Sequence, residues 1–283
     1  MGLKNKPILF FACMYDSLFN RVEDMSNLIF RFLVFFMGLC IGSFLNVCIS
    51  RIPRGLSIVR PGSRCPDCLA AIAFYDNIPV ISWVLLKGRC RACGKTISLR
   101  YPLVELATGV MAVLVMLKYG LSVSALIYFL LICALITISL IDLDHRIIPD
   151  SISLPGIAAG FLASFLLPEL SWLDSLIGIL VGGGILYAVA LGYYLFAGKE
   201  GMGGGDIKLL AMLGAFIGWK GVFFTIFAAS LIGTAVGVAM MLAAGKNLKF
   251  AVPFGPFLSV GAVIYLFFGQ SIIQWYFYGA GPW

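Results

Sequence analysis

The chain has 283 residues, of which 61% are hydrophobic and only 12% are charged. An average soluble domain is about one quarter charged, and one core of this size cannot bury so much apolar surface, so an ordinary soluble protein is excluded. A mean hydropathy of +1.02 and long runs without charge predict an all-α polytopic membrane protein in a lipid bilayer. The net charge is +7, but basic residues of membrane proteins gather in cytoplasmic loops, so we expect no nucleic-acid partner.

The first 28 residues stand apart from this pattern. The apolar run 7–14 is too short to span a membrane, and no small-residue cleavage site follows it. We interpret residues 1–28 as an N-terminal extension of unknown role. Translation could also start at Met25, directly before the first long apolar run.

Eight apolar segments predict about eight transmembrane helices. A spanning helix needs about 20 apolar residues, and the clearest segments carry no Asp, Glu, Lys or Arg: 32–50, 121–141, 175–197, 221–245 and a part of 251–283. Three weaker segments lie between them, at 103–117, 151–168 and 207–219. The first two could be re-entrant, and the third could be part of a broken helix.

Basic residues are concentrated after the first of these helices. Residues 51–100 carry nine Lys or Arg against two acids, so the positive-inside rule places this segment in the cytoplasm. The loops around 142–150, 199–206 and 246–249 then face the cytoplasm as well. We divide the chain into the extension 1–28, a first transmembrane helix 29–50, a cytoplasmic domain 51–102 and a membrane domain 103–283.

Four of the eight cysteines form two Cys-x-x-Cys pairs in the cytoplasmic domain: Cys65, Cys68, Cys90 and Cys93. Two such pairs can bring four thiolates to one tetrahedral ion, and Gly94 suits the tight turn of a zinc ribbon. Basic neighbours favour thiolates and a reducing cytoplasm disfavours disulfides, so we predict a structural Zn²⁺. A membrane thiol oxidoreductase is the alternative. The other cysteines are interpreted as apolar packing residues: Cys13, Cys40, Cys48 and Cys133.

Acidic residues in or beside membrane helices are costly and therefore point to function. The candidates are Glu105, Asp142, Asp144 and Asp206. Asp142 follows the charge-free helix 121–141, and Asp206 opens the next apolar stretch after three glycines. Both lie at the cytoplasmic ends of their helices, so the two carboxylates can meet at the same membrane depth.

Two carboxylates brought close together share a proton, so one can act on a water molecule as base and the other as acid. That is the chemistry of an aspartic protease. Gly203 and Gly205 would let a backbone approach Asp206, because they carry no side chain. In the alternative interpretations, the acids cap helices or pair with nearby basic residues, or they serve a proton-coupled transporter.

In their order and spacing, these features resemble one family, the bacterial type IV prepilin peptidases, which belong with the Gly-x-Gly-Asp intramembrane aspartic proteases. The likeness extends from about residue 29 to the C-terminus. It rests on the motifs at 42–47 and 51–53, the two cysteine pairs, and the motifs at 100–106, 142–150 and 203–210.

The resemblance selects the catalytic residues. The first catalytic aspartate of the family lies six residues before the isoleucine of an Ile-Pro pair, which selects Asp142 over Asp144, and Asp206 matches the second. We interpret Asp144 as supporting or structural and His145 as an ordinary loop histidine. Lys208 either points one turn beyond Asp206 or extends to the lipid headgroups.

The resemblance also implies the activity. The enzyme would lie in the bacterial inner membrane, with its active site and cysteine domain facing the cytoplasm. It would remove the basic leader peptide of type IV prepilins or secretion pseudopilins after a glycine. Family members with the cysteine domain then methylate the new N-terminal residue with S-adenosylmethionine. No Rossmann-like unit marks the cofactor site, and Glu105, where the domain enters the membrane, is our candidate for a residue that serves methylation.

Overall fold

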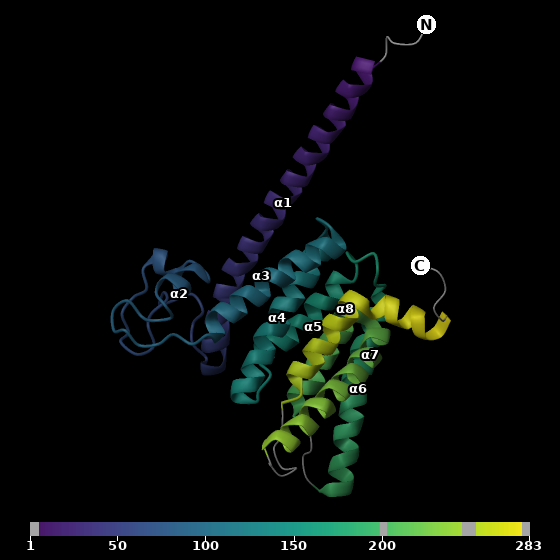
Figure 1. Ribbon diagram of the computed structural model, residues 1–283. Helices are drawn as coiled ribbons and strands as arrows, with labels where there is room; N and C mark the ends of the chain where they lie inside the picture. The colour runs from purple at the N-terminus through teal and green to yellow at the C-terminus, as the bar shows by residue number, and fades with distance from the viewer. Residues whose placement is uncertain (1–5, 199–202, 245–252, 279–283) are drawn as a thin grey trace.

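A computed structural model describes residues 6–198, 203–244 and 253–278 (Figure 1). The described part is all-helical, as the sequence predicts, and contains only two isolated β-bridges beside its helices. The helices are α1 (Lys6–Arg51), α2 (Ile81–Leu85), α3 (Arg100–Tyr119), α4 (Val123–His145), α5 (Asp150–Ala163), α6 (Trp172–Ala197), α7 (Gly204–Ala244) and α8 (Gly255–Tyr278), with short 3₁₀ turns at Ile52–Arg54 and Phe74–Asn77.

The predicted extension and the first transmembrane helix form one continuous helix, α1. The reason lies in the sequence, which has no glycine or proline between Pro7 and Gly38 to end a helix. The candidate membrane span Leu28–Arg54 covers the C-terminal part of α1 and the 3₁₀ turn that follows it.

Six helices of the described part are long and apolar enough to span a membrane, compared with about eight expected. The difference has two causes. Helix α5 has only 14 residues, which is too short for a full span. The two helices predicted at 207–219 and 221–245 are two arms of α7, which meet at Gly218 with φ 68° and ψ 176°.

The contacts of the two arms show that the chain reverses direction at Gly218, because α6 begins and α8 ends near this glycine: Asp174 and Gln274 line one cavity with it. The first arm of α7 packs antiparallel to α6, since Gly178 contacts Gly214 and Gly182 contacts Leu210. The second arm packs antiparallel to α8, with Gly233 against Phe257 and Gly261 against Thr225. Glycine adopts the required positive φ without steric cost, so the sequence can fold back within one residue.

The hydrophobic core lies around α4 and the first arm of α7. Its fully buried side chains include Ile132, Leu135, Ile138 and Ile141 of α4 and Leu209, Leu210 and Leu213 of α7. These are the two helices that carry the predicted catalytic aspartates. Helices α5 and α8 each contact both of them, so the core links the positions of α4 and α7.

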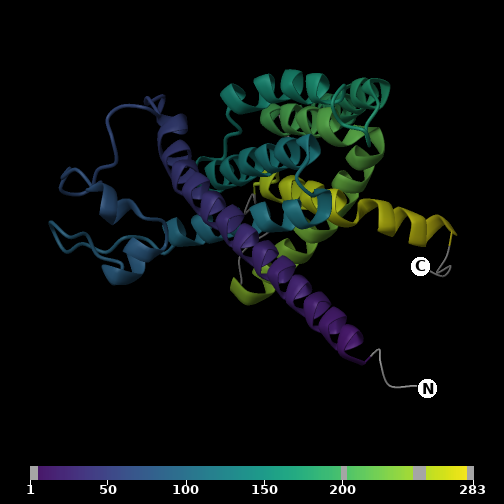
Figure 2. The same cartoon turned by 90° about the horizontal axis from the view of Figure 1, so that it is seen from above.

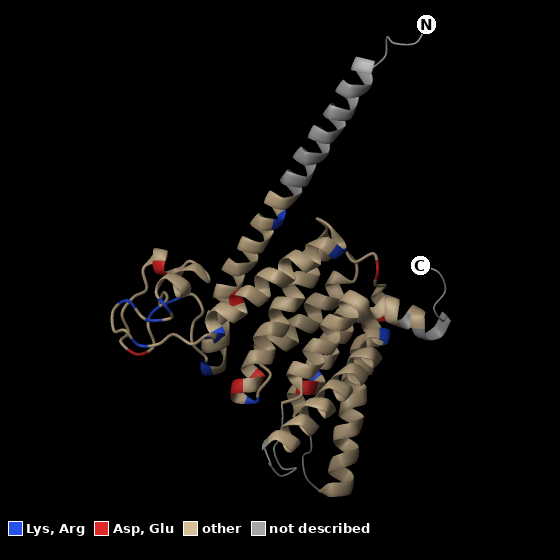
Figure 3. Ribbon diagram, in the orientation of Figure 1, with Lys and Arg blue, Asp and Glu red and all other residues tan. Residues whose placement is uncertain are grey.

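The segment between the 3₁₀ turn at Ile52–Arg54 and α3, which we call the cysteine segment (residues 55–99), lies to one side of the long helices. Figures 1 and 2 show it beside the C-terminal end of α1 and the N-terminal end of α3. Charged residues gather in the cysteine segment and at the ends of helices (Figure 3). The predicted cytoplasmic loop at 246–249 and Lys199 lie outside the described residues.

Candidate active site and cysteine cluster

The two Cys-x-x-Cys pairs converge in the cysteine segment. The Sγ atoms of Cys65, Cys68, Cys90 and Cys93 all lie within 4.8 Å of one another, and 3.9 Å separates those of Cys65 and Cys93. Four sulfur atoms at this spacing can surround one tetrahedral metal ion. The predicted metal-binding cluster is therefore confirmed as an arrangement of side chains.

Both pairs lie in the same kind of turn. The N–H of Leu69 donates to the carbonyl of Cys65 at 3.0 Å, and the N–H of Gly94 donates to the carbonyl of Cys90 at 2.9 Å. Both donors have a positive φ, 58° at Leu69 and 71° at Gly94. Gly94 thus makes the tight turn that the sequence predicts, whereas Leu69 adopts the same conformation with a side chain, which is unfavourable.

The charge of the cluster fits a bound cation. Backbone N–H groups of Cys68 and Asp67 lower the pKa of the Cys65 thiol to about 7. The backbone N–H of Lys95 favours the thiolate of Cys93, yet desolvation and the other three sulfur atoms raise its pKa to about 11. Four thiolates therefore do not form at neutral pH without a positive ion, and metal binding to such a site releases protons.

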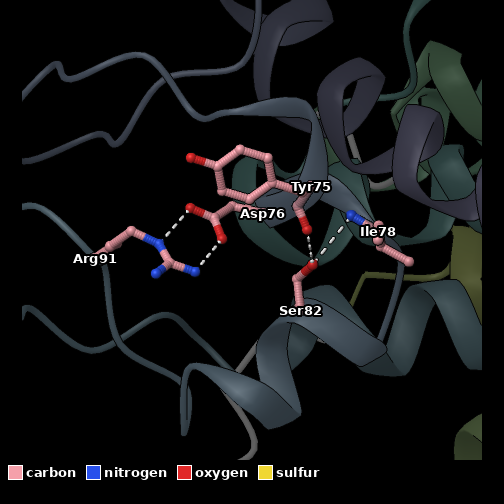
Figure 4. A network of polar contacts seen from close by, with 5 residues as sticks. All are labelled: Tyr75, Asp76, Ile78, Ser82 and Arg91. Atoms are coloured by element: carbon pink, nitrogen blue, oxygen red, sulfur yellow. Dashed lines mark hydrogen bonds and ion pairs between the residues drawn. The ribbon is translucent and has the colours of Figure 1, made fainter.

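An ion pair connects the second cysteine pair to the loop before α2. Arg91, next to Cys90, donates from Nε and Nη2 to the two carboxylate oxygens of Asp76 at 2.8 and 2.7 Å (Figure 4). These hydrogen bonds hold the pKa of Asp76 below its usual value. The pair is therefore present at neutral pH and is lost only when the pH falls through that lowered pKa.

Asp142 lies in the last turn of α4, and only 5% of its surface is exposed. Its Oδ2 accepts a hydrogen bond of 3.1 Å from the backbone N–H of Gly255, the first residue of α8. A Cβ at position 255 would lie 2.6 Å from this oxygen. The absence of a side chain at Gly255 thus allows α8 to approach Asp142.

Asp206 lies in the first turn of α7, is half-buried and interacts electrostatically with Asp142. Ile148 lies close both to Gly205, next to Asp206, and to Gly255, which donates a hydrogen bond to Asp142. A Cβ at Gly205 would lie 2.9 Å from the Cβ of Ile148, and a Cβ at Gly255 would lie 3.4 Å from its Cδ1. The two aspartates chosen from the sequence are thus brought into one site, which we call the aspartate pair.

Two other predicted site residues form ion pairs of their own. Nη1 of Arg100 lies 2.5 Å from Oδ2 of Asp144, and both side chains are partly exposed. Nζ of Lys208 lies 2.7 Å from Oδ1 of Asp150, so it pairs across to the start of α5. Each ion pair joins two helices near the aspartate pair. The charges of Asp144 and Lys208 are neutralised by their ion-pair partners, which favours structural roles for both residues.

Glu105 is separate from the aspartate pair and connects α3 to α1 and to the cysteine segment. It is buried, with 7% of its surface exposed, and its Oε2 accepts a 2.7 Å hydrogen bond from the backbone N–H of Val80. The side chain of Ser43 also bonds to it. Helices α1 and α3 cross closely here, because a Cβ at Gly42 would lie 2.7 Å from the Cα of Glu105.

The remaining predicted residues divide into exposed and buried ones. Gly203 is exposed just before α7, with open space around it, and His145 is exposed at the end of α4. Cys48 and Cys133 are buried, as expected of packing residues, whereas Cys40 is exposed on α1. The side chain of Cys13 lies outside the described residues.

Sequence reasoning missed Gly255 as a residue of the site. The available signal was the sequence Phe254-Gly255-Pro256 at the start of an apolar stretch. Proline within the first turn marks the start of a helix. It does not indicate that the helix begins against a carboxylate 113 residues earlier, so the sequence offered no functional reason to choose this glycine.

Comparison with known protein families assigns both halves of the chain. The family described as the bacterial peptidase A24 N-terminal domain matches residues 36–119, and the type IV leader peptidase family matches residues 129–238. The first match contains the cysteine segment and Glu105, and the second contains both members of the aspartate pair. No solved structure matches the chain.

Curated relatives agree with the family assignment. A prepilin leader peptidase/N-methyltransferase of Aeromonas hydrophila is 37% identical over 86% of this chain and 92% of its own length. The protein of that name in Pseudomonas aeruginosa is 38% identical, over 87% and 92%. That of Myxococcus xanthus is 42% identical over 77% of this chain, which spans only 65% of that relative.

None of these three names supports a thiol oxidoreductase or a transporter. The six apolar helices are those of a membrane protein. The relatives are bacterial, and two of them align over nearly their whole length. The chain therefore belongs to the type IV leader peptidase family, in the bacterial group of prepilin leader peptidase/N-methyltransferases.

Proposed function

We propose that this membrane enzyme cleaves the leader peptide of type IV prepilins or pseudopilins with Asp142 and Asp206 as its catalytic residues. The observation that carries the proposal is the convergence of these two carboxylates, one from the end of α4 and one from the start of α7, next to Ile148. Their neighbours Asp144 and Lys208 are each neutralised by an ion pair. The aspartate pair is the arrangement that suits acid–base chemistry on a peptide.

The two carboxylates act together on one water molecule. One is ionised and takes a proton from the water while the water oxygen forms a bond to the peptide carbonyl carbon. The other is protonated and donates a hydrogen bond to the carbonyl oxygen, where negative charge develops. The C–N bond then breaks, and the leaving nitrogen takes a proton from the pair, which releases the leader and a new amino terminus.

Two apolar helix ends extend beyond the level of the aspartate pair: the C-terminal part of α6 and the end of the second arm of α7. Because Gly182 of α6 faces Leu210 and the helices are antiparallel, Asp206 lies level with about Leu186. Helix α6 continues to Ala197, about 16 Å farther at 1.5 Å per residue. Leu242, near the end of α7, and Phe196 of α6 are largely exposed. An apolar substrate helix can lie along these two helix ends with its leader at the aspartate pair.

We place the protein in the bacterial inner membrane with the aspartate pair and the cysteine segment on the cytoplasmic side. The cysteine segment carries six Lys or Arg residues, and Arg100, Arg146 and Lys208 lie at the same helix ends as the aspartate pair, whereas the opposite ends carry Lys118 and Lys220. Cytoplasmic regions of membrane proteins are enriched in Lys and Arg. Leaders of substrates made in the cytoplasm would therefore reach the aspartate pair without crossing the membrane.

We propose that the second activity, N-methylation, uses S-adenosylmethionine and depends on a structural Zn²⁺ at the four cysteines. The cofactor supplies an electrophilic methyl group. When bound, it would supply this methyl group to the free amine of the new N-terminus, and the amine would lose a proton to solvent. A structural Zn²⁺ fits the closed Cys₄ set, which leaves no ligand position for chemistry.

The test of the peptidase proposal is leader removal in liposomes. Purified protein is incubated with a prepilin, and the product is identified by mass spectrometry. We expect Asp142→Asn and Asp206→Asn each to lower the cleavage rate by about 10⁴-fold, the size of effect that loss of a catalytic group has in other proteases. Cleavage at wild-type rates by either variant would refute the assignment of the aspartate pair.

Asp144→Asn is the matched control, because it makes the same chemical change two residues from Asp142. Its partner Arg100 is partly exposed, and ion pairs of this kind contribute about 0–1 kcal/mol. We expect this variant to keep its cleavage rate within about fivefold of wild type. A loss comparable to that of Asp142→Asn would mean that Asp144 belongs to the catalytic pair.

A further inference from the structure

A large cavity lies between the cysteine segment and the membrane helices. Its volume is about 1140 Å³, and its lining includes Ser43 and Asn46 of α1, Tyr101 and Glu105 of α3 and residues on both sides of α2. Sites for small molecules and cofactors typically occupy about 300–1,000 Å³. The space is therefore large enough for a cofactor together with the end of a peptide.

The wall of this cavity on the membrane side carries a buried carboxylate. The hydrogen bonds to Glu105 come from neutral groups, the backbone N–H of Val80 and the side chain of Ser43. Burying a carboxylate is costly unless a cation or several hydrogen bonds compensate it. Glu105 thus favours the cationic part of a ligand at this wall. Other parts of the cavity are lined by further charged residues: Arg51, Arg64, Arg91 and Lys95, with Asp67 and Asp76.

The part of the lining around α2 is held together by hydrogen bonds. The hydroxyl of Ser82 donates to the carbonyl of Tyr75 at 2.8 Å and accepts from the N–H of Ile78 at 3.1 Å (Figure 4). Arg91 binds Asp76 through two hydrogen bonds and lies 5.7 Å from the centre of the Tyr75 ring. This part of the lining therefore presents an ordered aromatic ring, with the guanidinium of Arg91 beside it.

The flat rings and the guanidinium suit two further parts of one ligand. Tyr75, Trp83 and Tyr101 all line the cavity, and aromatic rings stack on purines. Arg91 uses Nε and Nη2 on Asp76, so Nη1 retains donors for a ligand carboxylate. The cavity thus combines an anionic wall, aromatic faces and a guanidinium.

We infer that this cavity is the binding site of the methyl donor, an adenosyl sulfonium amino acid, and that Glu105 faces its cationic part. The inference rests on the proposed N-methyltransferase activity and specifies where that activity takes place. The aromatic rings receive the purine, and Arg91 receives the carboxylate. The donor is thereby held between the cysteine segment and α3, outside the aspartate pair.

The cavity and the aspartate pair are connected through one residue. Arg100 precedes Tyr101, which lines the cavity, and it binds both Asp144 and the carbonyl of Leu140 near the end of α4. Asp142 lies in that same turn. We therefore expect a new N-terminus released at the aspartate pair to reach the donor along the start of α3.

The test is equilibrium binding of S-adenosylmethionine to the full-length protein in detergent, measured by isothermal titration calorimetry. We expect Glu105→Gln, which keeps an acceptor for Val80, and Tyr75→Ala each to weaken binding by tenfold or more. Glu169→Gln is the control, because Glu169 lines a different cavity, beside Trp219 and the N-terminal end of α6. It should bind like wild type. Melting temperature and metal content are measured for every variant to show that it is folded.

Photochemical cross-linking of the donor, followed by mass spectrometry, locates the site directly. An adduct within residues 74–91 or 101–105 supports the inference. Wild-type affinity in both Glu105→Gln and Tyr75→Ala, or an adduct elsewhere in the chain, would overturn it while the methyltransferase proposal stands. If wild-type protein cleaves a prepilin but neither binds the donor nor methylates the product, the methyltransferase proposal itself fails.

Discussion

At the scale of single residues, Gly255 is the neighbour of the aspartate pair with the clearest testable role. Its N–H donates to Asp142, and a Cβ there would lie 2.6 Å from the Asp142 carboxylate. We expect Gly255→Ala to displace the carboxylate and to lower kcat for leader cleavage by roughly 10–100-fold, because small displacements of reacting groups are costly. KM should change little, since the glycine does not bind substrate. Steady-state kinetics in liposomes measure both constants.

Gly237→Ala serves as the matched control for Gly255→Ala. Gly237 lies in the second arm of α7, and a Cβ there meets nothing within 4 Å. The control should keep the wild-type kcat. If Gly255→Ala raises KM and leaves kcat unchanged, Gly255 contributes to substrate binding and not to the position of Asp142.

The sequence allowed a choice between neighbouring acids but did not show what each one contacts. The family resemblance, through the spacing to Ile148, implied Asp142 and not Asp144. The structure adds a physical difference between them: Asp142 is buried, whereas Asp144 pairs with Arg100. That partner lies 44 residues away in the sequence. Contacts of this range depend on how α3 and α4 pack, which no local pattern specifies.

At the scale of helices, the close packing of α6 on the first arm of α7 depends on glycine. A Cβ at Gly178 would overlap the backbone carbonyl of Gly214, which cannot move aside as a flexible side chain could. We expect Gly178→Ala to destabilise the protein by about 1–3 kcal/mol, the usual cost of overpacking. A lower melting temperature in detergent, measured by tryptophan fluorescence, would report this loss.

Gly184→Ala tests whether that effect is specific to the contact. Gly184 lies in the same helix, but a Cβ there meets no atom within 4 Å. Since alanine favours helices over glycine by about 0.5–1 kcal/mol, this variant should melt at or slightly above the wild-type temperature. Equal melting temperatures for the two variants would contradict the assigned role of Gly178.

The helices themselves could be predicted better than their directions. Apolar runs separated by charged or glycine-rich segments located the helical segments, because lipid requires both length and low charge. The reversal at Gly218 was not evident, since a glycine in an apolar run is compatible with a straight helix, a kink or a turn. The contacts of the two arms with α6 and α8 establish it, together with the position of Asp174 and Gln274 beside Gly218.

At the scale of the whole molecule, the cysteine segment and the aspartate pair occupy separate parts of the structure. Cysteine spacing predicted the metal cluster because its ligands are close in sequence within each pair. The cavity could not be predicted, since residues of α1, α3 and the cysteine segment form it together. The aspartate pair is instead held by α4, α7 and α8.

This separation predicts that removal of the metal affects the two activities unequally. Without the ion, Cys90 is no longer tied to the other three cysteines, so its turn can shift. Arg91, the next residue, would then no longer hold Asp76, and Tyr75 would lose its fixed position in the cavity. We expect Cys90→Ser to bind less metal and to lose at least tenfold in donor binding and methylation. Leader cleavage should stay within about fivefold, because the buried core around α4 and α7 fixes the aspartate pair. Mass spectrometry of one prepilin reaction resolves cleaved from methylated product. Parallel losses of both activities would instead mean that the metal stabilises the entire membrane domain.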